Sequence, residues 1–283
     1  MGRRLIACVA VAAGVVAQSS LAQVVLSRSI FHRVDLPSKT IRDVAVSCPR
    51  GYVAVSAGVS NPAPGVTVPS IWPSGLAGYK FRLVNPVTNS DQQATVVVAC
   101  RNFVFKAPTT RLKVTSVQVK LKVPARQLRA TALPCPPSTV PAGWGYDIAP
   151  VKSGRGSGRM SMRRVSMHLG GFSFSLRNSG AKAQSVTLSG TCLTALRPAG
   201  TSQERLHVKI TTFRVPLQAG SHGVVRKCPA GWVSLSAGYA LRSPLATIDG
   251  AAAIGAGGRW WVASDSEGAA TADLQLVCTR LSM

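Results

Sequence analysis

The chain has 283 residues, with 33 Lys and Arg against only 9 Asp and Glu, which gives a formal net charge of +24. Glycine (26) and proline (18) are plentiful, and charged residues make up only 15% of the chain. This composition argues against long charged helices and is typical of short strands joined by turns. Because carboxylates are few, the chain also has few candidate side chains for general acid–base catalysis.

The first 22 residues have the three parts of a signal peptide. Arg3 and Arg4 supply positive charge, residues 5–17 form an apolar run, and small residues precede a cleavage site after Ala22. We therefore expect export to the periplasm, the cell surface or the medium. Lipid attachment at Cys8 is the less favoured alternative, because too little apolar sequence precedes it. No later segment is long and apolar enough to span a bilayer, so the mature chain is expected to be soluble.

Six cysteines follow the signal peptide in a regular pattern. Within successive pairs the two cysteines are 52, 57 and 50 residues apart, and shorter gaps separate one pair from the next. This alternation indicates a repeating unit that contains two cysteines. The predicted disulfides are Cys48–Cys100, Cys135–Cys192 and Cys228–Cys278.

The residues around the cysteines repeat with the same spacing. The first and third copies share Cys-Pro-x-Gly, and the second copy keeps Cys-Pro. A glycine follows ten residues after each first cysteine, at Gly58, Gly145 and Gly238. Later in each copy an aromatic residue opens a strand that ends in a turn residue. These pairs are Tyr79 and Asn85, Phe172 and Asn178, and Trp260 and Ser266. The mature chain is therefore expected to be three copies of one unit.

We call these copies the first repeat (23–105), the second repeat (106–200) and the third repeat (201–283). Each contains segments for about six short antiparallel strands. The expected fold class is all-β, with three tandem small antiparallel β-sandwich modules that are each closed by one disulfide. A unit of this size has a small core, and closing such a loop contributes roughly 4 kcal/mol. The recurring aromatic residue is expected to pack in the core against the disulfide.

The pattern Cys-Pro-x-Gly, then Gly, then Trp or Tyr running into Asn, then a strand ending in Cys, resembles a known kind of module. It is similar to the short repeat modules of secreted actinobacterial and proteobacterial proteins of uncharacterised function. The likeness covers nearly all of the mature chain and is weakest in the second repeat, where Pro137-Ser138 replaces x-Gly. The resemblance implies a β fold and export, and it implies no particular activity.

Basic residues are concentrated in the second repeat. Residues 101–200 contain 16 Lys and Arg against one acid, Asp147. Lys120 and Lys122 alternate with apolar residues, so they should share one exposed strand face. In residues 152–164 arginines alternate with glycines, which would let backbone amides and guanidinium groups approach an anion. The candidate ligand-binding residues are Lys120, Lys122, Arg126, Arg129, Arg155, Arg159, Arg163 and Arg164.

Two interpretations of this charge remain open. The first is a binding site for a polyanion, such as an anionic envelope glycan, lipopolysaccharide-type phosphates, lipid head groups or extracellular DNA. Few aromatic residues accompany the basic ones, which favours a glycan or head group over single-stranded nucleic acid. The second interpretation is that the charge merely keeps a secreted protein soluble and protects strand edges from aggregation.

The sequence shows no recognisable catalytic, metal or cofactor site. The only glutamates, Glu204 and Glu267, have no partner carboxylate in the pattern of a glycosidase. The four histidines lack metal-like spacing, and Ser166-Met167-His168 lacks the Gly-x-Ser-x-Gly turn of a serine hydrolase. The histidines are His32, His168, His207 and His222. We therefore expect a protein that is not an enzyme and that needs no cofactor or metal.

The sequence leaves two hypotheses for function. One is a binding protein of the envelope or extracellular matrix that engages an anionic polymer through its basic second repeat. The other is a structural subunit that self-associates into a fibre, sheath or matrix through strand edges. The second hypothesis depends on the apolar segment 23–31, which could add as a strand to a neighbour or, as we favour, pack on its own repeat.

Overall fold

The computed structural model describes residues 24–60, 66–105, 111–149, 160–196, 205–243, 246–264 and 270–282, and every helix or strand assigned in them is a β-strand. The predicted signal peptide lies outside these ranges. The first repeat forms β1 (Val24–Leu36), β2 (Ile41–Ser47), β3 (Val53–Ser60), β4 (Thr67–Pro73), β5 (Gly78–Val84) and β6 (Gln92–Val104). The second forms β7 (Arg111–Val123), β8 (Leu128–Pro134), β9 (Val140–Ile148), β10 (Met160–His168), β11 (Gly171–Asn178) and β12 (Gln184–Leu196). The third forms β13 (Arg205–Pro216), β14 (Gly220–Lys227), β15 (Val233–Leu241), β16 (Ala246–Ile254), β17 (Gly257–Ser264) and β18 (Thr271–Ser282).

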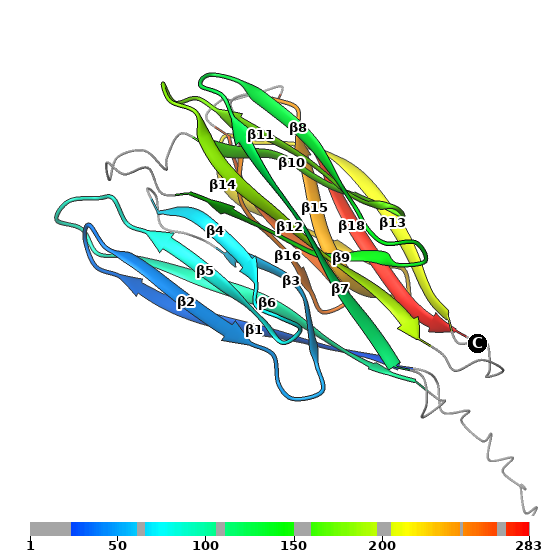
Figure 1. Ribbon diagram of the computed structural model, residues 1–283. Helices are drawn as coiled ribbons and strands as arrows, with labels where there is room; N and C mark the ends of the chain where they lie inside the picture. The colour runs from blue at the N-terminus through cyan, green and yellow to red at the C-terminus, as the bar shows by residue number, and fades with distance from the viewer. Residues whose placement is uncertain are drawn as a thin grey trace, which may run out of the picture.

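These strands form four antiparallel sheets (Figure 1). Two sheets have three strands, in the orders β1-β6-β3 and β14-β17-β16. The other two have six strands, in the orders β2-β5-β4-β9-β12-β7 and β13-β18-β15-β10-β11-β8. The prediction of an all-β fold is thus confirmed.

The prediction of three separate sandwich modules is wrong, because strands of different repeats pair with each other. β4 pairs with β9 at Ser70 and Asp147, and β10 pairs with β15 at Arg164 and Ala240. A three-stranded sheet leaves unpaired N–H and C=O groups along its edge, and pairing with the next repeat satisfies part of them. The four sheets therefore have a propeller-like arrangement that crosses the repeat boundaries.

Within this arrangement the three repeats keep one internal order. Each places its first, sixth and third strands side by side, and its second, fifth and fourth strands side by side. In each repeat the first cysteine directly follows the second strand and the other lies in the sixth strand, so the disulfide links the two sets of strands. The three predicted disulfides are confirmed, with Cα–Cα distances of 5.7, 5.8 and 5.8 Å.

The recurring aromatic residues are core residues. Tyr79, Phe172 and Trp260 are all 0% exposed and belong to the main hydrophobic clusters. The indole Nε1 of Trp260 donates a hydrogen bond of 2.8 Å to the Gly238 carbonyl. A buried indole N–H needs such a partner, and here the partner is the repeat glycine of the same unit.

The turn residues at the end of the aromatic strand have a structural role that recurs. The side-chain amides of Asn85 and Asn178 are buried, and each donates to the carbonyl of the last residue of its repeat's first strand. These bonds join Asn85 to Leu36 (2.9 Å) and Asn178 to Val123 (3.1 Å). Each asparagine thereby connects the two sets of strands at the end of the repeat. Ser266 of the third repeat lies outside the described residues.

The glycine that lies ten residues after the first cysteine of each repeat is found where two repeats meet. A Cβ atom at Gly145 would overlap the carbonyl oxygen of Ile71 in β4, and a Cβ at Gly238 would overlap that of Val165 in β10. Glycine therefore lets the backbones of neighbouring repeats approach closely at both junctions.

The third member of this set, Gly58, makes the corresponding contact between the first and third repeats. A Cβ at Gly58 would lie 2.8 Å from the carbonyl oxygen of Ala251 in β16. β3 and β16 lie side by side, but they belong to different sheets. The order of contacts is thus first to second, second to third and third to first, which closes the three repeats into a ring.

The described part of the chain contains no helix that could cross a membrane. The apolar segment after the predicted cleavage site is part of β1, which pairs with β6 along its whole length, from Val24–Val104 to Leu36–Gln92. Residues 24–31 thus pack on their own repeat.

Candidate functional site: an arginine-lined groove

The structure separates the predicted basic residues into different places. Lys120 and Lys122 are exposed on β7, where they pair with Thr187 and Ser185 at the edge of one six-stranded sheet. Arg126 lies in the turn after β7 and has a φ of 57°.

Arg129 is exposed on β8, at the edge of the other six-stranded sheet. Arg163 and Arg164 lie inside this second sheet, on β10. Arg155 and Arg159 fall outside the described residues. The predicted residues therefore do not form a single cluster among the described residues, and only Arg163 and Arg164 share a cavity.

That cavity is an open groove of about 730 Å³ over β8, β11, β10 and the end of β15. We call it the arginine groove. It is lined by Leu128, Ala130, Thr131, Ala132, Arg163, Arg164, Ser173, Phe174, Ser175, Arg177, Leu241 and Arg242. Four of these residues are arginines and none is acidic. Among the described residues, the groove therefore presents positive charge without a lining carboxylate.

Cross-strand pairing explains the shape of the groove. Ala130 pairs with Ser175, and Ala132 pairs with Ser173, so these four small side chains share one face of the sheet. Their size leaves room above β8 and β11. Arg164 pairs with Ser175 on the other side and lies on the same face. The groove thus has a floor of alanine and serine next to an arginine.

Two arginines of the groove are free to meet a ligand. Arg164 and Arg177 are both exposed, and neither has a hydrogen bond or ion pair to a described residue. Arg177 pairs with Leu128 on β8, and Arg164 pairs with Ala240 on β15. A planar guanidinium group binds sulfate, phosphate or carboxylate with two parallel hydrogen bonds.

The other two arginines are already engaged by the protein. Arg242 forms an ion pair of 2.6 Å with Asp273. Arg163 donates from Nη1 to the Ala246 carbonyl at 2.8 Å and from Nη2 to the Ser243 carbonyl. Burial lowers the pKa of Arg163, and the nearby Arg177 contributes in the same direction. These two side chains add positive potential, and their bonds to the protein fix them in the wall of the groove.

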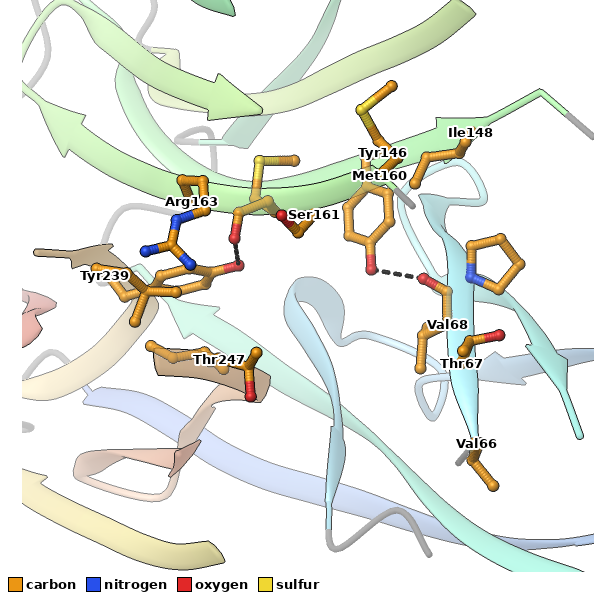
Figure 2. Close-up of a pocket in the computed structure, with 14 residues that line it drawn as sticks. Val66, Thr67, Val68, Tyr146, Ile148, Met160, Ser161, Arg163, Tyr239 and Thr247 are labelled. Carbon is orange, nitrogen blue, oxygen red and sulfur yellow. Dashed lines mark hydrogen bonds between the residues drawn. The ribbon is translucent and has the colours of Figure 1, made fainter. Parts of the chain in front are cut away.

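Arg163 also lies at the edge of a second, smaller pocket of about 250 Å³, where residues of all three repeats meet (Figure 2). Across this pocket the hydroxyl of Tyr146 donates to the Val68 carbonyl at 2.8 Å. The hydroxyl of Tyr239 donates to the Met162 carbonyl at 3.5 Å. Each tyrosine directly follows a repeat glycine and bonds to the preceding repeat, so this pocket reflects how the repeats are joined.

Sequence reasoning missed two of the four groove arginines. Arg177 could have been found, because Ser173, Ser175 and Arg177 alternate along one strand and should share its polar face. Arg242 belongs to the third repeat, and its place beside Arg164 depends on the pairing of β10 with β15. That pairing between repeats leaves no signal in a single sequence.

The described residues contain no group of three or more His, Cys, Asp or Glu side chains that could hold a metal ion. No protein-family model matches this chain, and no curated protein is significantly similar to it. The chemistry of the site is therefore inferred from its geometry and charge.

Proposed function

We propose that this chain is an exported, non-catalytic binding protein of the cell envelope or extracellular matrix that engages an anionic polymer. The observation that carries the proposal is the pair of exposed guanidinium groups of Arg164 and Arg177, which have no partner and no acidic neighbour in the groove among the residues that the structure describes. An open groove suits a polymer better than a small ligand, which is usually enclosed. A sulfated, phosphorylated or carboxylated glycan, or a lipopolysaccharide-type head group, has the required charge.

Export is the second part of the proposal. Three disulfides are typical of proteins that fold in an oxidising compartment. The charge pattern of residues 1–22 supports removal of a signal peptide after Ala22. N-terminal sequencing of the protein secreted by a bacterial host would test this part, and a mature chain that begins at Gln23 is the expected result.

Retention of the full mature chain on immobilised heparin tests the binding proposal. The variant R164Q/R177Q should elute at clearly lower salt than the parent protein. The control variant R28Q/R42Q removes the same charge from exposed positions of the first repeat. If both variants shift equally, binding follows net charge alone and the groove has no special role.

The Lys120 and Lys122 pair gives a second control. It lies on a different sheet from the arginine groove. A K120Q/K122Q variant should therefore shift elution less than R164Q/R177Q does. A larger shift in elution for K120Q/K122Q would mean that the polyanion binds at the edge of β7 and not in the groove.

A structural role through strand edges remains the second candidate. The observation that favours it is β1, a strand of 13 residues at the edge of its sheet, with Leu26 and Phe31 exposed at 42% and 54%. Exposed edges of this kind can pair with another chain. Light scattering of the parent protein and of an L26S/F31S variant tests this role. A monomeric parent protein and a variant of unchanged size would exclude it.

A further inference from the structure

The outer face of the sheet β2-β5-β4-β9-β12-β7 carries a continuous row of polar residues across two repeats. Residues paired directly across neighbouring strands point to the same face of a sheet. Following the pairs from β2 to β7 gives the order Asp43, Arg82, Ser70, Asp147, Thr187 and Lys120. The row thus contains two acidic, two basic and two hydroxyl residues, and it begins in the first repeat.

A tryptophan lies next to this row. Trp72 is two residues beyond Ser70 on β4, so its side chain is on the same face, and it pairs with Lys80 on β5. Trp72 is partly exposed, whereas Ser70 is only 8% exposed. Around them is an open recess of about 480 Å³, whose lining includes both residues together with Asp43, Lys80, Arg82 and Asp147.

The polar groups of the recess are held in place to different degrees. Arg82 donates from Nε (2.8 Å) and Nη2 (3.2 Å) to the two carboxylate oxygens of Asp43, which fixes the plane of the guanidinium group. This bond raises the pKa of Arg82, and the charge of Asp147 adds to the effect. Asp147 itself has no hydrogen bond or ion pair to a described residue, so its oxygens are available as acceptors.

The balance of charge distinguishes this recess from the arginine groove. Lys80 and Arg82 face Asp43 and Asp147, so two cations meet two anions and the lining is neutral overall. Such a recess has no preference for a polyanion. It offers fixed donors, free acceptors and an indole ring, which together match a ligand with many hydroxyl groups and an apolar ring face.

We propose that this recess, which we call the Trp72 recess, binds a neutral saccharide. The C–H face of one sugar ring packs on the indole of Trp72. The sugar hydroxyls donate to Asp147 and accept from Lys80 or from the remaining N–H groups of Arg82. The open shape lets a chain of sugars continue along the row toward Thr187 and Lys120.

This inference is independent of the proposed polyanion site. The Trp72 recess lies on another sheet and takes a ligand without charge. Sugar binding here should depend weakly on salt, because no net charge is neutralised. Binding in the arginine groove should depend on salt strongly.

The test is a titration of the full mature chain with a panel of neutral hexasaccharides of glucose, mannose and N-acetylglucosamine. Binding is followed by tryptophan fluorescence and by calorimetry. We expect at least one member to bind and to change the fluorescence. W72A and D147N should each weaken that binding by about tenfold or more, whereas W72Y should keep most of it.

The matched control is W232A, because Trp232 is also partly exposed but packs under Arg280 in the third repeat, with 4.8 Å between the guanidinium carbon and the ring centre. This variant and R164Q/R177Q should bind the sugar as the parent does. Circular dichroism and thermal unfolding of each variant check the fold. The proposal is overturned if no neutral hexasaccharide binds at millimolar concentration, or if W72A and D147N bind it unchanged.

Discussion

The Nε atom of Arg101 donates a hydrogen bond of 2.6 Å to the carbonyl oxygen of Ser234, and this bond joins the first repeat to the third. Arg101 follows the second cysteine of its repeat and is 0% exposed. Its other nitrogens donate to the Cys100 carbonyl, the Ser234 hydroxyl and the Gly255 carbonyl. No carboxylate is among these partners. Within the described part of the chain, a buried cation held by neutral acceptors thus closes the junction between the first and third repeats, whose strands share no sheet.

Replacing Arg101 with methionine should destabilise the fold. The change removes the donor that satisfies the Ser234 carbonyl, and it removes a bridge between repeats. The cost of burying a positive charge disappears at the same time, so we expect a net loss of about 2 kcal/mol. Urea unfolding measures the loss. The exposed Arg28 provides the control, because R28M should stay within about 0.5 kcal/mol of the parent. Equal midpoints for both variants would contradict the bridging role.

Adding one methyl group at Gly145 should be costly. The new Cβ of G145A would overlap the Ile71 carbonyl and would press β9 away from β4. Overpacking of this kind costs about 1–3 kcal/mol. Gly223 in β14 is the matched control, because a Cβ there meets no atom within 4 Å. Thermal unfolding should therefore show a lower midpoint for G145A and little change for G223A, and the reverse order would refute the close contact between repeats.

The buried Tyr79 and the half-buried Tyr146 should respond differently to loss of the hydroxyl group. The hydroxyl of Tyr146 bonds to Val68, whereas that of Tyr79 has no hydrogen-bond partner among the described residues. Y146F should lose about 1 kcal/mol, and Y79F should be neutral or stabilising because no bond is broken. Chemical denaturation of both variants checks the prediction. Greater destabilisation by Y79F would show that its hydroxyl has a partner.

The same two phenols predict a loss of stability at alkaline pH. Burial raises the pKa of both Tyr79 and Tyr146 above the ordinary value of a tyrosine, which is about 10. In the unfolded chain these phenols release their protons first. The stability that the two protonated phenols contribute is therefore fully present below about pH 10, and it is lost as the pH rises above that value. Urea midpoints across this range should fall less steeply in the double variant Y79F/Y146F than in the parent protein.

Asp273 predicts a second pH effect, in acid. Its hydrogen bond to Arg242, with a further bond to Arg214, holds the pKa of this carboxyl below its ordinary value of about 4. As the pH falls below that value, the unfolded chain takes up the proton first. The stabilisation is thus present above about pH 4 and is lost below it. D273N should show a smaller decrease of the unfolding free energy between pH 5 and acid than the parent, and identical profiles would contradict this assignment.

Local features of the fold could be predicted because they repeat along the chain. The cysteine spacing predicted all three disulfides, and the alternation of apolar residues predicted strands. The repeat glycines were recognised from their spacing, but their role was not. The carbonyls that they approach, such as that of Ile71 for Gly145, belong to another repeat. Nothing in the order of residues identifies which strand edges of three similar units pair with each other.

The same limit applies to the candidate site. Charge counting identified the second repeat, and Arg163 and Arg164 do lie in the groove. Lys120 was grouped with them because the three are in one repeat. However, the six strands of this repeat divide between two sheets, with β7, β9 and β12 in one and β8, β10 and β11 in the other, and this places Lys120 on a different sheet from Arg164. Membership of a sheet therefore decides which charges act together, and it depends on pairing over long distances.

The most direct test of the proposed function is the salt dependence of binding to a soluble heparin fragment. The logarithm of the association constant should fall linearly with the logarithm of the salt concentration. Each arginine that contacts an anionic group contributes roughly one to the slope, so R164Q/R177Q should lower the slope by about two. The control R28Q/R42Q should leave it unchanged. An unchanged slope in R164Q/R177Q, with affinity equal to that of the parent, would contradict binding of a polyanion in the arginine groove.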